Sequence, residues 1–323
     1  MYKKKNFNIK IKCLICKEST EYLDDYKFHI KSDQSFFGHL KIHYCNKCDF
    51  AFANPMPQIK KLNRFYKYIY RDYGRPHHTD LDFAEADLFN QKNMNYIQYL
   101  STFINFNKIN NIFDYGSGSG DIGYLLKKRF THLKLHTIEN DIFSKKILKK
   151  RSYKIYNQFK DINTKFDLII CTHVLEHLTN LNILNNFKKI LKKNRYMLIE
   201  VPNNLFNINF MERAYDSPHL IFFSKKTFVQ ISKKYNLNIK NLTYSSISIE
   251  TVHEYMKKSI LIFGNWPKHN IKRLIHTLKQ LTIDKILRKI TKDIFNINNK
   301  ISYENFINGD KNSWCLRVLF KNT

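Results

Sequence analysis

Short apolar runs alternate with amphipathic stretches along most of the chain. The apolar runs predict seven β-strands, near residues 110–114, 134–139, 153–157, 166–171, 195–201, 238–245 and 314–320. Between them, stretches such as NLNILNNFKKILKKN and KKTFVQISKKYN place apolar residues at helical spacing. Alternating strands and helices are typical of a mostly parallel sheet covered on both faces. The pattern therefore predicts an α/β fold with ligands bound outside the carboxyl ends of the strands.

A long amphipathic insert separates the last two predicted strands, at about residues 250–310. It contains HNIKRLIHTLKQLTIDKILRKITKDIF, in which Lys and Arg lie opposite apolar residues at helical spacing. We expect an accessory helix packed on the sheet. A lid or dimer contact, a membrane-surface helix and a phosphate-facing groove are alternatives.

Three regions follow from these patterns. Residues 1–55 are a small cysteine-containing module, 56–105 a helical bridging segment, and 106–323 the α/β domain. No run of eighteen apolar residues occurs, and the basic N-terminus lacks an apolar signal segment. We therefore expect a cytoplasmic protein without a transmembrane segment.

Four of the six cysteines form two C-x-x-C pairs, Cys13 with Cys16 and Cys45 with Cys48. Two such pairs supply the four thiolates of a tetrahedral structural zinc site. A disulfide or redox pair is disfavoured in a chain without an export signal. A region this short buries little core, so a bound metal would explain how it folds. We expect structural Zn²⁺ here, and no catalysis, because four thiolates leave no open coordination position.

The other cysteines and the nearby histidines are expected to have no metal role. Cys171 and Cys315 lie in apolar runs, as buried strand residues do. His29, His39 and His43 are expected to be surface or secondary residues rather than ligands.

A glycine-rich turn follows the first predicted strand of the α/β domain. The run INNIFDYGSGSGDIGYLLKKRF reads as a strand ending at Asp114, a turn, and a helix beginning near Asp121. Such a turn lets backbone amides approach a ligand closely. Glu139 ends the second strand, where a carboxylate can accept both ribose hydroxyls of a nucleoside.

The ligand that suits this turn carries a positive charge. The spacing is G-x-G-x-G rather than the G-x-G-x-x-G of dinucleotide sites. Asp114 precedes the turn directly, where its charge would repel a pyrophosphate and attract an ammonium or sulfonium group. S-adenosylmethionine fits this electrostatic pattern better than NAD does.

Several ordered motifs resemble class I S-adenosylmethionine-dependent methyltransferases. DYGSGSG with Glu139 resembles their first two motifs, FDLIICTHVLEHL their fourth strand and following turn, and RYMLIEVPN their fifth strand. The stretch YCNKCDFAFANPMP, followed by Phe65, Tyr66 and Tyr70, is similar to the zinc-ribbon leader of a bacterial subgroup associated with sugar, surface-polysaccharide or antibiotic tailoring. The resemblance implies a Rossmann-like sheet of seven strands, the last antiparallel, with the helical insert before the last strand.

The resemblance also implies roles for individual residues. The methionine end of the cofactor would be held by Asp114, Gly116, Gly118 and Gly120. Glu139 would bind the ribose hydroxyls, and Thr172 and His173 would line the cofactor or the reacting methyl group. Asp161, after the third strand, is a candidate to contact adenine.

A catalytic base is needed only if the acceptor atom carries a proton with a pKa well above ambient pH. His219, in YDSPHLIFFS, follows the loop after the fifth strand, where the family inserts substrate-facing segments. His219 and His173 are our candidate catalytic residues. For His177 we expect a structural role. For His219 a structural, hydrogen-bonding role is the alternative to catalysis.

The net charge of +28 first suggests nucleic acid. Lys is scattered through nearly every segment, however, and such a surface bears on solubility and non-specific binding. We predict O-methylation of a sugar nucleotide or surface-glycan sugar, a small-molecule acceptor. An RNA methyltransferase is the alternative, although CTHV after the fourth strand differs from the N/D-P-P-Y/F signature of amino methylation. A non-catalytic binding module is disfavoured by the intact motifs. Peripheral membrane contact through the insert stays open.

Overall fold

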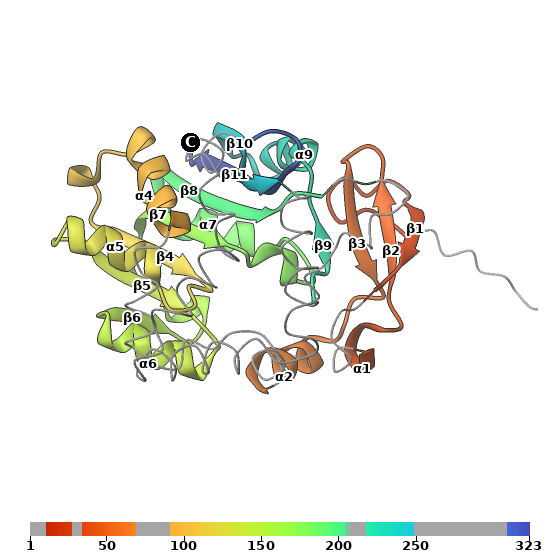
Figure 1. Ribbon diagram of the computed structural model, residues 1–323, viewed down its shortest axis with the longest axis horizontal. Helices are drawn as coiled ribbons and strands as arrows, with labels where there is room; N and C mark the ends of the chain where they lie inside the picture. Colours follow the sequence, from red (N-terminus) through yellow and green to blue (C-terminus); the bar gives the residue numbers. More distant parts are fainter. Residues whose placement is uncertain (1–10, 28–33, 69–90, 205, 207–217, 249–308) are drawn as a thin grey trace, which may run out of the picture.

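A computed structural model gives the fold, in which a small sheet stands beside a large one (Figure 1). The structure describes residues 11–27, 34–68, 91–204, 206, 218–248 and 309–323. The small sheet is formed mainly by the N-terminal residues, and the large one by the remainder of the described chain. None of the helices in these ranges is long and apolar enough to cross a membrane.

The large sheet has seven strands in the order β10-β11-β8-β7-β4-β5-β6. Their bounds are β4 Asn111–Tyr115, β5 Lys134–Ile138, β6 Tyr153–Tyr156, β7 Phe166–Thr172, β8 Leu191–Pro202, β10 Asn238–Ser248 and β11 Ser313–Lys321. Neighbours from β8 to β6 pair in parallel, and β11 pairs antiparallel with both β8 and β10. All seven predicted strands and the antiparallel last strand are thereby confirmed.

Helices and short 3-10 turns connect the strands and cover the sheet. Their bounds are α4 Gln91–Phe103, η2 Phe106–Lys108, α5 Asp121–Arg129, α6 Ile142–Lys150, η3 Phe159–Asp161, η4 Leu175–His177, α7 Ile183–Ile190 and α9 Lys225–Tyr235. Successive residues of β7 enter different apolar clusters: Ile169 belongs to one, and Leu168 and Ile170 to the other. A strand buried on both faces reads as a continuous apolar run, which is the pattern of FDLIIC.

The helix predicted over NLNILNNFKKILKKN is shorter than its pattern indicates. It ends at Ile190, and β8 begins at Leu191, which pairs with Phe166 of β7. Asn194 adopts a left-handed conformation with φ 60° inside the strand. An irregularity in the pairing of β7 and β8 occurs in this region. The helical periodicity therefore continues into residues that the sheet pairs.

The small sheet has the order β1-β2-β3-β9, all antiparallel. Its strands are β1 Glu21–Asp25, β2 Lys41–Cys45, β3 Phe50–Asn54 and β9 Ile221–Phe222, and two helices, α1 Gln34–Phe37 and α2 Ile59–Tyr68, lie beside it. Phe65 of α2 packs edge-on against Phe37 of α1 at 5.1 Å between ring centroids. The first helix of the bridging segment thus contacts the N-terminal module.

The sequence does not predict strand β9, because the strand has only two residues, both paired with β3, and so shows no periodic pattern. It comes from the chain between β8 and α9 and continues the N-terminal sheet. The Ser224 and Thr227 hydroxyls at the start of α9 donate hydrogen bonds of 2.7 and 2.6 Å to the Asp49 carbonyl oxygen. The module therefore docks through residues 221–227 as well as through the bridging segment.

Some sequence predictions fall outside the described residues. These are nearly all of the helical insert at 250–310, together with His29 and Tyr70. Cys171 in β7 and Cys315 in β11 are described, and both are buried as expected.

Candidate functional site

The glycine-rich turn joins β4 to α5 and adopts the conformation that its glycines permit. Gly116, Gly118 and Gly120 have φ values of 63°, 56° and 74°. A methyl group added at Gly116 would lie 2.7 Å from Val174 Cγ2, and one at Gly120 would lie 2.6 Å from Leu148 Cδ2. At Gly118 it would meet no heavy atom within 4 Å. Two glycines are needed for close packing, and the middle one faces open space.

Side chains at the end of α6 and the start of β6 hold this turn in place. The Tyr153 hydroxyl donates a 2.8 Å hydrogen bond to the Gly120 carbonyl oxygen. The guanidinium of Arg151, which is 1% exposed, donates to the Ser119 carbonyl oxygen at 2.8 Å and to the Asp121 carboxylate. Arg151 and Tyr153 were missed by sequence analysis, because no local pattern shows that β6 packs on the turn.

Three carboxylates lie near the turn. Glu139 accepts hydrogen bonds of 2.8 Å from the backbone N–H groups of Gly118 and Asp141. Burial, and next the charges of Glu139 and Asp121, raise the pKa of Asp114 well above its usual value. A cation bound here would lower the cost of ionising Asp114. The buried carboxylate and the open space at Gly118 fit the sulfonium and ammonium groups of S-adenosylmethionine.

The segment after β7 lies directly against the turn. Val174 limits the space at Gly116, and His173 beside it has a φ of 55°, unusual for a residue other than glycine. Thr172 pairs in register with Glu200 of β8, so both lie at the carboxyl ends of adjacent parallel strands.

Asp161, the candidate to contact adenine, ends η3, after β6. It accepts a 3.2 Å hydrogen bond from the Gln158 backbone N–H.

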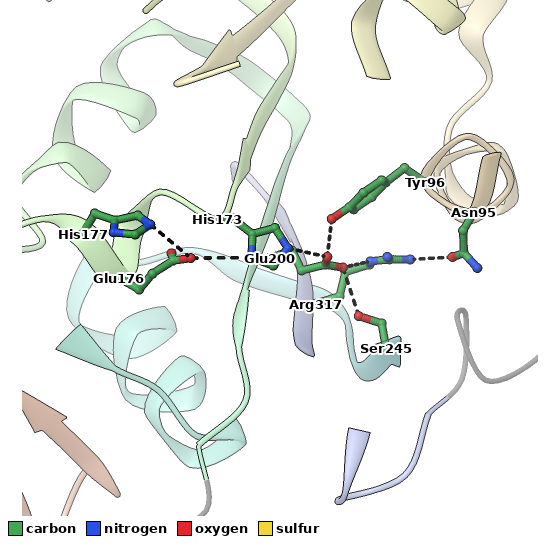
Figure 2. Close-up of polar contacts among 8 residues, drawn as sticks. All are labelled: Asn95, Tyr96, His173, Glu176, His177, Glu200, Ser245 and Arg317. Atoms are coloured by element: carbon green, nitrogen blue, oxygen red, sulfur yellow. Dashed lines mark hydrogen bonds and ion pairs between the residues drawn. The ribbon is translucent and has the colours of Figure 1, made fainter. Parts of the chain in front are cut away.

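A buried polar network surrounds Glu200 (Figure 2). The Glu200 carboxylate, 2% exposed, accepts hydrogen bonds from the Tyr96 hydroxyl, from Arg317 Nε at 2.5 Å and from Ser245 Oγ at 3.0 Å. Arg317 also donates to Asn95 Oδ1 at 3.2 Å. Burial raises the pKa of Glu200, but Arg317 and then His173 outweigh it and hold that pKa far below its usual value.

A second carboxylate, Glu176, lies between the imidazoles of His173 and His177 (Figure 2), and His219 is close to it as well. His173 Nδ1 and His177 Nε2 are 3.6 and 3.9 Å from its Oε1 atom. The rings of His177 and His219 are 4.8 Å apart between centroids. The structure thus brings both catalytic candidates, His173 and His219, close to one buried acid. Sequence patterns gave no indication of Glu176. Glu200 could have been noticed, because it is an acidic residue inside the apolar run of β8.

The four cysteines of the N-terminal module lie together. Their Sγ atoms are all within 4.8 Å of one another, and those of Cys16 and Cys45 are 3.6 Å apart. Tetrahedral zinc with bonds of about 2.3 Å holds its sulfurs about 3.8 Å apart. The Ile15 backbone N–H donates to Cys13 Sγ at 3.3 Å, and none of the four forms a disulfide. This donor set fits a structural zinc ion.

Comparisons with known proteins agree with this geometry. Residues 85–242 match a family described as a methyltransferase domain, which spans α4 to part of β10 and leaves the four cysteines outside. None of the curated proteins matches the chain.

Distant likenesses to solved structures were also found. Coclaurine N-methyltransferase, bound to N-methylheliamine and SAH, has 14% identity over 72% of both chains, with a TM-score of 0.46. A putative sarcosine dimethylglycine methyltransferase from Galdieria sulphuraria has 17% identity over 81% of this chain and 98% of its own, with a TM-score of 0.46. An O-methyltransferase of a Brevibacillus brevis trans-AT PKS multienzyme has 15% identity over 75% and 76%, with a TM-score of 0.40. These distant likenesses assign no substrate.

Proposed function

We propose that this chain is an S-adenosylmethionine-dependent methyltransferase that methylates a hydroxyl oxygen of a sugar nucleotide or surface-glycan sugar. The match of residues 85–242 to a methyltransferase domain supports the class of reaction. The observation that carries the proposal is the cluster of the buried Glu176 with His173 and His177, which follow β7, and His219, which precedes β9. His173 and Glu176 flank Val174, which contacts the turn at Gly116. The polar groups that would act on an acceptor therefore lie beside the turn that would hold the cofactor.

The turn and its carboxylates would hold the cofactor. Asp114 would face the cationic end, the glycine backbone would approach it closely, and Glu139 would accept the ribose hydroxyls. Thr172 would line the same side from the end of β7. S-adenosylmethionine supplies a methyl group already activated by its sulfonium. The protein then contributes mainly orientation and exclusion of water.

The acceptor side would be formed by His173 and His219. Each lies beside Glu176, and a hydroxyl acceptor needs a group that receives or displaces its proton. The four-cysteine leader, with structural zinc, supports the sugar-tailoring assignment through its resemblance to that subgroup. CTHV at the end of β7 speaks against amino methylation of nucleic acid. A sugar-nucleotide acceptor also accords with a cytoplasmic location.

Methyl transfer from radiolabelled S-adenosylmethionine to sugar nucleotides is expected to exceed transfer to total RNA. The measurement incubates the full chain with each acceptor pool and follows label into the sugar by mass spectrometry. The charge of +28 makes RNA the necessary comparison. Label incorporated into RNA, with salt-sensitive retention on it and none in sugars, would replace this proposal with the RNA alternative.

Replacing Glu139 with alanine is expected to weaken S-adenosylmethionine binding by about tenfold or more, because a charge-assisted hydrogen bond contributes about 1.5–3 kcal/mol. Isothermal titration calorimetry measures the affinity. Glu21→Ala, which removes an exposed acid of β1, serves as the control and should bind like the wild type. Equal affinities for Glu139→Ala and the wild type would refute the assignment of the ribose site.

A further inference from the structure

Glu176 is buried without the hydrogen bonds that a carboxylate needs. Its side chain is 1% exposed, and among the described residues neither Oε1 nor Oε2 accepts a hydrogen bond. The nearest imidazole nitrogens, on His173 and His177, lie at 3.6 and 3.9 Å, beyond hydrogen-bond length. A buried carboxylate that accepts no hydrogen bond is costly, and its ion-pair partners among the described residues are imidazoles beyond hydrogen-bond distance. A cation bound directly to the carboxylate would offset this cost.

The contrast with Glu200 shows that the fold can satisfy such a group. The Glu200 oxygens accept hydrogen bonds from Tyr96, Ser245 and the guanidinium of Arg317 (Figure 2). Among the described side chains, no lysine or arginine forms an ion pair with Glu176. The two acids therefore differ in two respects: Glu200 accepts hydrogen bonds, and it is paired with a permanently charged guanidinium.

The groups around Glu176 are those that bind metals. A carboxylate oxygen of Glu176 and one nitrogen each of His177 and His219 lie within 4.8 Å of one another. Bonds of about 2.0–2.2 Å would place such donors about 3.0–3.6 Å apart, so small side-chain rotations close the set around an ion. A hydrogen bond of 2.6 Å from the Leu220 N–H to the Glu176 carbonyl oxygen fixes the two segments that carry these donors.

We propose that Glu176, His177 and His219 form a second metal site, which binds a divalent first-row transition ion such as Zn²⁺ or Mn²⁺. Two imidazoles and one carboxylate are a common donor set for these ions, and three protein ligands leave a position open for water or a substrate oxygen. His173 is the nearest further donor. Binding of the acceptor hydroxyl at the open position rests on the proposed function. The metal site itself does not rest on it.

The test uses Mn²⁺ with the full chain whose four-cysteine site has been loaded with zinc. Imidazole and carboxylate accept Mn²⁺, whereas thiolates favour softer ions. Electron paramagnetic resonance of free Mn²⁺ measures binding. One Mn²⁺ per chain is expected, and Glu176→Gln and His219→Asn should each weaken its affinity by about tenfold or more.

His136→Asn is the matched control, because His136 is buried in the sheet at 7% exposure, as His219 is at 9%. It should bind Mn²⁺ like the wild type. S-adenosylmethionine binding by each variant shows that the fold is retained. Mn²⁺ that stays free with the wild type, or binds equally to Glu176→Gln and His219→Asn, would overturn the metal site. Mn²⁺ binding without methylation of any sugar would instead refute the proposed function and leave the site standing.

Discussion

Replacing Arg317 with methionine is expected to lower the free energy of unfolding by about 3–5 kcal/mol. Methionine keeps most of the buried volume, but it leaves the Glu200 carboxylate, 2% exposed, without its charged partner. Tyr96 and Ser245 would still donate hydrogen bonds to it. Two neutral donors do not offset the cost of burying an unpaired charge.

Urea unfolding measures this effect, and two further variants isolate its cause. Adding Glu200→Gln to Arg317→Met should recover a large part of the loss, because the buried charge is then absent. Arg195→Met is the matched control: Arg195 pairs with Asp167 on the same sheet but is 32% exposed, and Asp167 keeps Lys192. It should cost about 1 kcal/mol or less. If Arg317→Met lowered the free energy of unfolding no more than Arg195→Met does, a buried unpaired charge on Glu200 would not be the cause.

The pH dependence provides an independent check on the same pair. The pKa of Glu200 is held far below its usual value in the folded protein, mainly because Arg317 outweighs the effect of burial. Stability from this pair is therefore present above the ordinary pKa of glutamate, about 4.3, and declines as the pH falls below it. In Arg317→Met the unpaired acid can be protonated. The stability difference from the wild type should narrow from pH 7 toward pH 3.

The seven strands could be predicted because each is a short apolar run bounded by polar segments. Strands buried on both faces, such as β7, give the clearest signal. Strand β9 could not be predicted, because its pairing of Ile221 and Phe222 with β3 joins segments about 170 residues apart and leaves no period in the sequence. The end of α7 was missed because sheet pairing overrode a helical pattern.

The candidate site likewise contains residues that local sequence predicts and residues that only the tertiary fold brings together. Asp114, the glycines and Glu139 could be found because each follows directly from a strand end, where local sequence determines position. The partners of Glu200 could not, because Tyr96 and Arg317 lie 104 and 117 residues away along the chain. Such a network exists only once α4, β8 and β11 are packed together. The tertiary fold therefore completes a candidate site whose glycine-rich side follows from the local sequence.

Replacing Cys45 with serine is expected to abolish the zinc binding that we propose for the four cysteines and to open the N-terminal module. Cys45 ends β2, its thiol is buried, and its Sγ is 3.6 Å from that of Cys16. Metal binding contributes about 10–16 kcal/mol in zinc-finger peptides. The module also buries Ile42, Phe50 and Phe52 in a core that it shares with the large sheet, so we expect local opening around the cysteines rather than loss of the whole fold. Serine binds zinc poorly, so much of this free energy is lost.

Bound zinc by mass spectrometry and hydrogen exchange of residues 11–54 measure the two effects. Zinc should fall by one ion per chain, and amides of β2 and β3 should exchange faster. Cys171→Ser, a buried cysteine of β7 outside the cluster, is the control and should retain the zinc even if stability falls. Because β9 pairs with β3, exchange at Ile221 and Phe222 should rise together with that of the module in Cys45→Ser. Unchanged zinc content and protection would show that the four thiols do not hold the metal. Loss of protection confined to residues 11–54 would show that β9 is held by the large sheet alone.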